Sequence, residues 1–346
     1  MLVQRLYYIK TVFFGLRSVF DNCKEYLKKG IYVIADNYTL KNSISNNTVS
    51  VFSDYYNEKN PIKKVFNNLI SKRKYVVSEK NDYNGELIVV SSSRKQYKIF
   101  DFDNKIVITK YKSKKQYFLC KSNYDYAKKI YRTSEIIKFD NQKLTTFERY
   151  LINNFNDKNN EIIYEKILFD YINNNTNYDT IKKSEITMPK KFKKYDILCK
   201  IYNNLIAENY IGFTKIKSHG DLWSSNIIYS HNNVYYIDFE TINYYSFFYD
   251  IFFYMYSEAY LKGDYTLLFN YFNGKYDTIF IEYFKKFDSK YNPDKKNIYL
   301  LYFIYEYVCS KWKVLSDKKI KVEINKIMVL LEKLNIKLGC DYCENK

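Results

Sequence analysis

The sequence lacks the features that would place it across a membrane. A transmembrane helix needs about 20 predominantly apolar residues, and no run of 18 uncharged apolar residues is present. The nearest candidate, residues 244–261, contains Asp250 and Glu258 and therefore predicts a buried helix. Residues 1–20 are basic and amphipathic, and such a segment is compatible with peripheral contact with a membrane surface. We expect that segment to pack on the protein instead.

The sequence also lacks the marks of a secreted or zinc-binding protein. No secretory signal peptide opens it, and its six cysteines are dispersed along the chain. We therefore expect reduced thiols and a cytoplasmic protein. Cys340 and Cys343 form a single CxxC pair, and neither of the two histidines stands at a spacing that would complete a zinc site. No metal or redox role is predicted for this pair.

Acidic residues are few compared with basic ones, and the formal net charge is +18. Such an excess favours anionic partners such as phosphates, nucleic acid or acidic membrane surfaces. The basic residues are scattered in short pairs, however, and no zinc-finger, homeodomain or RNA-binding motif is present. Much of the lysine also reflects a general bias of the sequence toward Lys, Asn, Ile and Tyr. Nucleic-acid binding is therefore disfavoured.

Residues 85–151 show the alternating apolar pattern of short strands. Five strands are predicted, with a helix near residues 122–131 between the third and the fourth. The strands cover residues 86–90, 96–102, 105–111, 135–139 and 143–151. The preceding residues 1–84 carry no chemical signature and form an N-terminal extension of unknown role.

Helical patterns dominate residues 152–346. In residues 195–210 the apolar positions follow a 3.6-residue stripe. Another well-patterned helix is expected at about residues 319–336. Between them, residues 226–240 predict a β-hairpin with a short polar turn.

The segment KSHGDLWSSNIIYSHNNVYYIDFE, residues 217–240, combines carboxylates and an amide at short spacing. Phosphoryl transfer from a nucleotide needs a carboxylate that orients the attacking hydroxyl. It also needs oxygen ligands that hold Mg²⁺ against the phosphates. Asp221, Asn226 and Asp238 meet these needs, because a loop can bring the first two together and the hairpin returns the third beside Asn226. The spacing therefore predicts a phosphotransferase site.

These motifs resemble the aminoglycoside phosphotransferase and choline kinase superfamily, whose members are relatives of the protein kinases. The superfamily's loop of HGD, four further residues and Asn matches residues 219–221 and Asn226. Its metal-binding strand matches the IDFE of residues 237–240, and its later structural DI pair matches residues 250–251. Asp221 would then be the catalytic base. The remaining implied roles are a loop brace at His219, magnesium ligands at Asn226 and Asp238, and structural support at Glu240 and Asp250.

The resemblance implies an α+β, two-lobed protein-kinase-like fold. Residues 85–151 would be the N-lobe, with a small antiparallel β-sheet, and residues 152–346 would be the mainly helical C-lobe with the acceptor site. In the N-lobe, Lys110 would be the nucleotide-binding lysine, although Lys105 and Lys112 lie close by. The helix that should offer this lysine a glutamate has only Asp125 nearby, which leaves the ion-pair partner open.

The resemblance also implies contacts with the nucleotide, which would be ATP or GTP. The loop SSSRK at residues 91–95 has no glycine. Hydroxyl groups of Ser92 and Ser93 and the guanidinium of Arg94 would therefore assist its backbone in holding the phosphates. Residues 148–150, beginning at Glu148, would form the hinge that meets the adenine.

We therefore expect an ATP-dependent enzyme that uses Mg²⁺ and phosphorylates a hydroxyl group of a small molecule. Candidate acceptors are a sugar, an amino alcohol such as choline or ethanolamine, and a glycan precursor of the cell envelope. The basic charge balance suits an anionic acceptor or a sugar better than a polycationic aminoglycoside.

The alternative is a catalytically inactive, kinase-like protein that binds nucleotide or serves as a scaffold. The complete set of Asp221, Asn226 and Asp238 argues against that alternative. A protein kinase is also disfavoured, because few residues separate Asp238 from the next helix. No pattern in the sequence indicates the oligomeric state.

Overall fold

The computed structural model describes most of the chain in two compact units. The described residues are 16–36, 39–45, 74–91, 96–173, 180–181, 186–208 and 212–338. The first unit comprises Met1–Asp125 and Thr133–Asn153, and the second comprises Tyr126–Arg132 and Asn154–Lys346. Among the helices within the described ranges, none combines the length and the apolar character that a membrane crossing requires.

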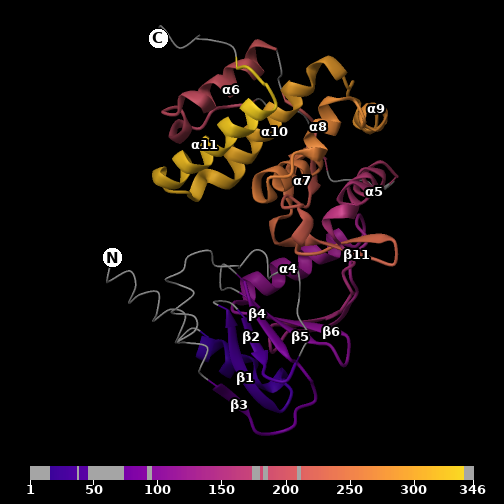
Figure 1. The fold of residues 1–346 in the computed structure, drawn as a ribbon, viewed down its shortest axis with the longest axis vertical. Helices are drawn as coiled ribbons and strands as arrows, with labels where there is room; N and C mark the ends of the chain where they lie inside the picture. The colour runs from indigo at the N-terminus through magenta and orange to yellow at the C-terminus, as the bar shows by residue number, and fades with distance from the viewer. Residues whose placement is uncertain are drawn as a thin grey trace. The chain divides into compact units, whose positions relative to one another are not determined.

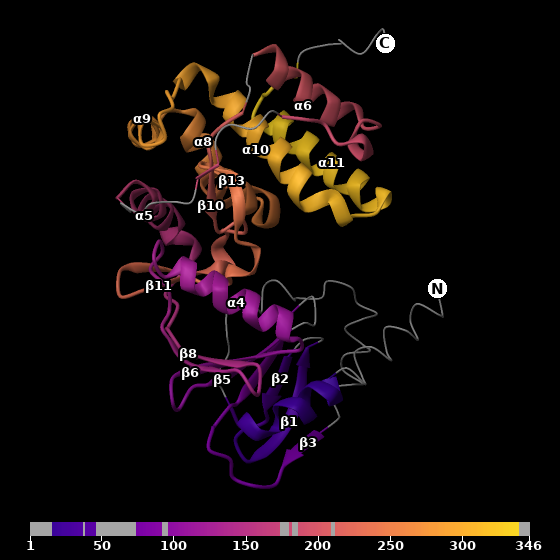
Figure 2. The ribbon, with the colours of Figure 1, turned by 180° about the vertical axis from the view of Figure 1, so that it is seen from behind.

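The first unit is built on an eight-stranded antiparallel sheet (Figures 1 and 2). Its spatial strand order is β3-β1-β2-β4-β5-β6-β8-β7. The strands are β1 (Gly30–Asp36), β2 (Thr39–Asn42), β3 (Lys74–Val77), β4 (Leu87–Val90), β5 (Gln96–Asp101), β6 (Ile106–Tyr111), β7 (Ile136–Asp140) and β8 (Thr145–Arg149).

Strands β4 to β8 correspond to the five strands predicted from the sequence, and helix α4 (Lys114–Ala127) separates β6 from β7 as expected. The helix begins several residues before the predicted range. Ser113 explains this start, because its hydroxyl group accepts the backbone N–H of Gln116 at 3.3 Å and acts as an N-cap. The expected α+β class is confirmed.

Residues before Gly85 also contribute strands to this sheet. β1 pairs with both β2 and β3, and β2 pairs with β4 through residues 39–41. The N-terminal extension, for which the sequence indicated no role, therefore supplies three of the eight strands among the described residues. The functional division of the chain at residues 84 and 151 stays a prediction.

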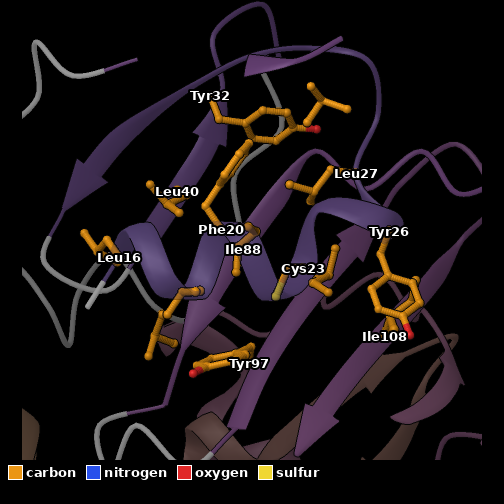
Figure 3. Packing of buried hydrophobic residues seen from close by; sticks show 14 of the residues in the cluster. Leu16, Phe20, Cys23, Tyr26, Leu27, Tyr32, Leu40, Ile88, Tyr97 and Ile108 are labelled. Carbon is orange, nitrogen blue, oxygen red and sulfur yellow. The ribbon is translucent and has the colours of Figure 1, made fainter. Parts of the chain in front are cut away.

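One face of the sheet is covered by the helical residues 16–23 (Figure 3). Apolar side chains at i, i+4 and i+7 of this segment, Leu16, Phe20 and Cys23, pack against Ile88 and Tyr97 in one buried cluster. Burial raises the pKa of the Cys23 thiol to about 12, so this thiol stays protonated. The segment is thus part of the core of the first unit.

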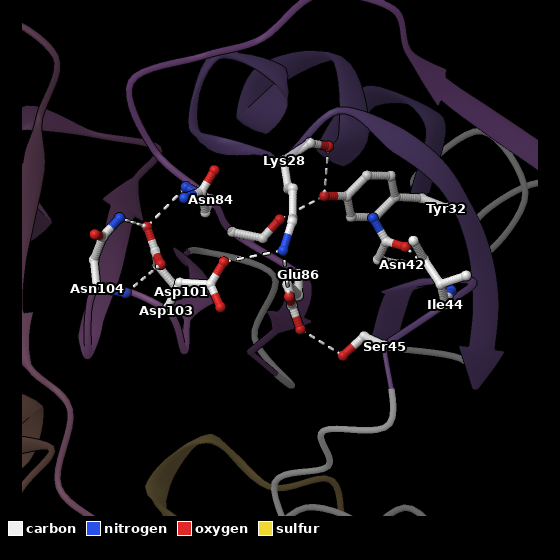
Figure 4. Close-up of polar contacts among 11 residues, drawn as sticks. Lys28, Tyr32, Asn42, Ile44, Ser45, Asn84, Glu86, Asp101, Asp103 and Asn104 are labelled. Atoms are coloured by element: carbon white, nitrogen blue, oxygen red, sulfur yellow. Dashed lines mark hydrogen bonds and ion pairs between the residues drawn. The ribbon is translucent and has the colours of Figure 1, made fainter.

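Polar contacts also connect the N-terminal residues to β4 and the turn after β5 (Figure 4). The ammonium group of Lys28 lies 3.2 Å from Glu86 Oε1 and 3.0 Å from Asp103 Oδ2. Ser45 donates to the other oxygen of Glu86 at 2.6 Å. Because Glu86 is 7% exposed, these donors satisfy a carboxylate that has little access to water.

The second unit is mainly helical, with a three-stranded sheet and a hairpin. Its helices are α5 (Asn160–Asn173), α6 (Asp196–Ala207), α7 (Tyr249–Ser257), α8 (Thr266–Phe272), α9 (Asp277–Lys285), α10 (Lys296–Lys311) and α11 (Asp317–Lys333). Its strands are β9 (Thr180–Ile181), β10 (Lys215–Ser218), β11 (Ile227–Ser230), β12 (Asn233–Tyr236) and β13 (Asn243–Ser246). The order in the small sheet is β13-β10-β9, and β11 pairs with β12.

The sequence patterns located several of these elements. In α6 the buried residues Leu198, Ile201 and Leu205 follow the predicted stripe. The predicted hairpin is present as β11 and β12. The segment 244–261, in contrast, is not one continuous helix, because its first residues pair with β10 as strand β13 before α7 begins.

Helix α7 is buried along its whole length, all nine of its residues being inside the second unit. Its aromatic side chains pack on neighbouring rings of α10 and α9. Phe252, for example, contacts Phe303 and Phe280 with ring centroids 6.1 and 5.9 Å apart. The many aromatic residues of this region therefore form the core.

Candidate phosphotransferase site

The loop that follows β10 requires glycine at its centre. Gly220 adopts φ +75°, a conformation that residues with a side chain rarely take. A Cβ atom at this position would overlap the ring of Tyr245 and lie 2.7 Å from the carbonyl oxygen of Thr241. Only glycine allows the backbone of the loop to approach these two residues.

The carboxylate of Asp250, at the start of α7, holds the backbone of this loop. Its Oδ2 accepts the N–H of His219 at 2.8 Å, and its Oδ1 accepts the N–H of Gly220 at 2.7 Å. The hydroxyl group of Tyr171 on α5 donates to Oδ2 at 2.8 Å. Asp250 is completely buried, so these three donors replace the water that the carboxylate has lost.

The imidazole of His219 connects the loop to the end of β12. Its Nε2 lies 2.9 Å from the carbonyl oxygen of Ile237, which can only accept, so Nε2 carries the hydrogen. Nδ1 is buried and has no hydrogen-bond partner within the described residues. The hydroxyl group of Thr241 donates to the carbonyl oxygen of His219 at 2.9 Å. This arrangement suits a residue that braces the loop better than one that transfers protons.

The structure brings the side chains of Asp221 and Asn226 together. The Asn226 amide NH₂ donates to the carbonyl oxygen of Asp221 at 2.8 Å and to its Oδ2 at 3.2 Å. Asn226 closes the short 3₁₀ turn η4 (Ser224–Asn226), which leads directly into β11. The amide therefore fixes both the backbone and the carboxylate orientation of Asp221.

Asp238 is positioned next to Asn226 by the hairpin. The backbone N–H of Ile237 donates to the carbonyl oxygen of Asn226 at 3.1 Å. This hydrogen bond brings the next residue in the chain, Asp238, close to the backbone of Asn226. Asp238 adopts the left-handed conformation, with φ 66° and ψ 63°. Such backbone conformations in residues other than glycine cost energy and cluster at functional sites. Glu240 lies exposed in the adjacent turn η5 (Phe239–Thr241).

These side chains fit a magnesium ion. Within the described residues, both side-chain hydrogen bonds of Asn226 are made by its amide nitrogen, which leaves the amide oxygen for a cation. Mg²⁺ in nucleotide enzymes is bound by one or two carboxylates together with substrate phosphates. The amide oxygen of Asn226 and the carboxylate of Asp238 supply such a set. The described part of the chain holds no cluster of three or more His, Cys, Asp or Glu side chains suited to a metal, and this kind of site needs none.

Lys311, at the end of α10, is a residue of this site that the sequence did not indicate. Its ammonium nitrogen lies 3.2 Å from Oδ1 of Asp221, while Asn226 contacts the other carboxylate oxygen. The pair is separated by 90 residues in the chain. No motif surrounds Lys311, so only the tertiary packing could have revealed it.

In the first unit, the structure shows the ion-pair partner of Lys110. The ammonium nitrogen lies 3.2 Å from Glu25 Oε1 and 2.8 Å from the carbonyl oxygen of Asn22. Glu25 also pairs with Lys143 at 2.5 Å. Burial of Glu25 raises its pKa, but the hydrogen bonds from Lys143 and Lys110 outweigh this effect, and the net pKa is lowered. The partner thus comes from the N-terminal extension, and Asp125 is not involved.

Lys110 lies on the sheet face that residues 16–23 cover. It pairs in register with Tyr97, a member of the buried cluster on that face. Lys98, the next residue along β5, pairs with Thr109 and therefore points to the opposite face. Helix α4 packs on that opposite face through the contact of Tyr117 with Tyr111. The two lysines thus mark two different surfaces of the sheet.

The other predicted nucleotide contacts are only partly within the described residues. Ser92, Ser93 and Arg94 of the predicted phosphate loop lie outside them. Glu148 is in β8 and accepts a hydrogen bond from the hydroxyl group of Ser134. All of these nucleotide contacts stay predictions.

Part of the chain matches the sequence profile of a known protein family. Residues 127–287 match the sequence profile of the ecdysteroid kinase-like family, a little under half of the chain, and the matched segment includes the loop from His219 to Asp250. The match confirms the resemblance to the kinase-like phosphotransferase superfamily and the expectation of an enzyme of that class. A comparison with curated proteins finds no match.

Several solved structures are similar to this chain at low identity. A choline/ethanolamine kinase family protein from Mesorhizobium loti has a TM-score of 0.43 and 8% identity, covering 72% of this chain and 89% of its own. A choline kinase from Streptococcus pneumoniae has a TM-score of 0.43 and 12% identity, with 70% and 92% covered. An ethanolamine kinase from Plasmodium vivax has a TM-score of 0.40 and 17% identity, with 70% and 80% covered. Similarities of this size do not identify an activity or a substrate.

Proposed function

We propose that this chain is a nucleotide-dependent phosphotransferase that phosphorylates a hydroxyl group of a small molecule. The observation that carries the proposal is the arrangement of Asp221, Asn226 and Asp238. Hydrogen bonds from Asn226 to Asp221, and from Ile237 to Asn226, draw the three residues into one loop region of the second unit. Asp250 keeps this loop in place.

Asp221 is the proposed catalytic base. Its carboxylate would accept the proton of the acceptor hydroxyl while the hydroxyl oxygen forms a bond to the γ-phosphorus of ATP or GTP. The bond between that phosphorus and the β–γ bridging oxygen breaks, and the nucleoside diphosphate leaves. His219 braces the loop through its contact with Ile237 and takes no part in the proton transfer.

Asn226 and Asp238 are the proposed ligands of Mg²⁺. When bound, the ion would neutralise charge on the phosphate oxygens. The structure supports this assignment through the orientation of the Asn226 amide, whose nitrogen is already used by Asp221. Lys110, supported by Glu25, is the proposed nucleotide-binding lysine. A cytoplasmic location belongs to the same proposal.

A magnesium-dependent assay of ATP and GTP consumption tests this function. Purified full-length protein is incubated with pools of sugars, amino alcohols and envelope glycan precursors, and nucleotide consumption is compared with and without each pool. We expect one pool to stimulate consumption. Asp221→Asn should lower that rate by about 10²- to 10⁴-fold, the usual contribution of a general base.

Asp294→Asn is the matched control, because Asp294 is also an aspartate of the second unit but is exposed. It should leave the rate unchanged. If nucleotide binds but no pool stimulates its consumption, the inactive scaffold is the correct alternative. If the stimulated rate is the same in Asp221→Asn as in the unchanged protein, Asp221 is not the catalytic base.

A further inference from the structure

Lys311 occupies a defined position at the end of α10. Residues 303, 307 and 311 are spaced four apart and so lie on one face of the helix. All three contact Phe253 of α7. The ring centroids of Phe303 and Tyr307 are 6.4 and 5.8 Å from that of Phe253, and the Lys311 ammonium is 5.7 Å from it. Packing of α10 on α7 thus carries the ammonium to Asp221.

The helix end that carries Lys311 is itself anchored. Trp312 is 1% exposed and contacts the ring of Tyr307. Lys191 donates to the carbonyl oxygens of Lys313 and Leu315 at 2.9 and 2.7 Å, which satisfies backbone acceptors that follow the last turn. Lys311 therefore approaches Asp221 from a fixed backbone.

The Lys311 ammonium has donors to spare. A lysine ammonium carries three N–H groups, and its one hydrogen bond within the described residues goes to Asp221. The side chain is 24% exposed, so the ammonium group is within reach of a small molecule in solution. The ammonium group lies beside the carboxylate that would receive the hydroxyl proton.

The same geometry disfavours a positively charged acceptor. Ammonium groups of ligands are commonly held against aromatic rings. Here the Lys311 ammonium already lies over the Phe253 ring and already pairs with Asp221. A second cation at this point would face an unfavourable like charge.

We infer that Lys311 is a specificity-determining residue that binds an anionic group, a phosphate or a carboxylate, next to the hydroxyl that this enzyme phosphorylates. This inference rests on the proposed function and narrows its substrate class to anionic alcohols. The two spare donors of the ammonium bind the anionic oxygens, while its third donor keeps Asp221 oriented. Charge-assisted hydrogen bonds of this kind are the strong ones in protein recognition.

The test uses acceptors that differ in charge. Glycerol 3-phosphate and glycerate are anionic, glycerol is neutral and choline is cationic. Their kcat/KM values are measured for the full-length protein and for Lys311→Met. We expect the anionic acceptors to be preferred, and Lys311→Met to lower kcat/KM for them by about 10- to 100-fold, the loss of a hydrogen bond to a charged group. The loss should appear mainly in KM, and Lys311→Arg should restore part of it.

Lys313→Met is the matched control, because it removes the same charge from an exposed lysine two residues away. It should leave these values unchanged. If choline is preferred and Lys311→Met improves its use, Lys311 merely occupies a cation site and the inference is overturned. Equal losses for Lys311→Met and Lys313→Met would also overturn it, because a general charge effect would then suffice.

A binding measurement separates this inference from the proposed function. Calorimetric titration with glycerol 3-phosphate, without nucleotide, requires no turnover. Binding that weakens about 10- to 100-fold in Lys311→Met but not in Lys313→Met supports the anion site even if no phosphorylation is found. Binding that is unchanged in Lys311→Met overturns the site, whatever the outcome of the nucleotide assay.

Discussion

The carboxylate of Asp250 accepts the backbone N–H of Gly220 at 2.7 Å, thirty residues earlier in the chain. A second backbone donor, His219, and the hydroxyl group of Tyr171 complete its hydrogen bonds. One buried carboxylate therefore binds two consecutive backbone N–H groups of the loop that carries the proposed base.

Replacing this carboxylate should destabilise the protein strongly. Asp250→Asn would turn one acceptor into an NH₂ group that faces a backbone N–H, and broken buried networks of this kind cost about 3 kcal/mol. We expect a lower free energy of unfolding together with lost activity, measured by chemical denaturation and the nucleotide assay. Tyr171→Phe removes one donor and should cost only about 1 kcal/mol. Equal stability of Asp250→Asn and the unchanged protein would show that the loop is held in another way.

Gly220→Ala should distort the same loop. The added Cβ would lie 2.7 Å from the Thr241 carbonyl oxygen in a backbone conformation of φ +75°. Strain of the conformation alone costs about 1–3 kcal/mol, and the overlap adds to it. Gly263→Ala provides the control, because φ is +73° there and the space around the new Cβ is open. We expect Gly220→Ala to have the lower melting temperature and to lose activity. If Gly263→Ala is equally destabilised, the overlap contributes nothing.

Lys110 and Lys98 lie on opposite faces of the sheet. Substituting each lysine therefore tests which face binds the nucleotide. Among the described residues, Glu25 and Asn22 use two donors of the Lys110 ammonium, and the third donor would serve a phosphate. We expect Lys110→Met to raise the dissociation constant for magnesium-ATP, measured with a fluorescent ATP analogue, and Lys98→Met to have little effect. The reverse ranking would move the nucleotide to the face on which α4 packs and reduce Lys110 to an anchor of the N-terminal residues.

The carboxylate of Glu25 should make stability depend on pH. Because its folded-state pKa is lower than its ordinary value of 4.5, its contribution is complete above that value and is lost as the pH falls through the folded-state pKa. We expect Glu25→Gln to be less stable than the unchanged protein at neutral pH by up to about 1 kcal/mol, since this pair is partly exposed. Denaturation curves should converge below pH 4.5. A constant difference at all pH values would contradict the pairing, and Glu79→Gln at an exposed position should show no such trend.

The sequence predicted the parts of the site that are close together in the chain. Asp221, Asn226 and Asp238 fall within 18 residues, so their spacing within a loop and hairpin was enough to infer proximity. Lys311 and Glu25 were missed because their partners lie 90 and 85 residues away. Such contacts depend on how the helices and the sheet pack in three dimensions. No pattern of neighbouring residues in the sequence predicts them.

The same distinction applies to the fold. Alternating apolar residues identified β4 to β8, and the stripe of α6 identified that helix, because both patterns are local. The sequence wrongly predicts helix for most of β13, because its aromatic residues are as compatible with a buried helix as with a strand. These residues form a strand because they pair with β10, a contact between distant parts of the chain.

The pairing of β2 with β4 has a practical consequence for shortened versions of this protein. Removing residues 1–84 would strip three strands from the sheet and expose the backbone N–H and C=O groups of β4 to solvent along residues 87–89. An unprotected strand edge with the apolar sequence LIVV is a template for intermolecular pairing and aggregation. Truncated proteins that begin at Gly85 would therefore be poor material for enzymology, and the residues ahead of it have to be kept in any form of the protein that is to be assayed.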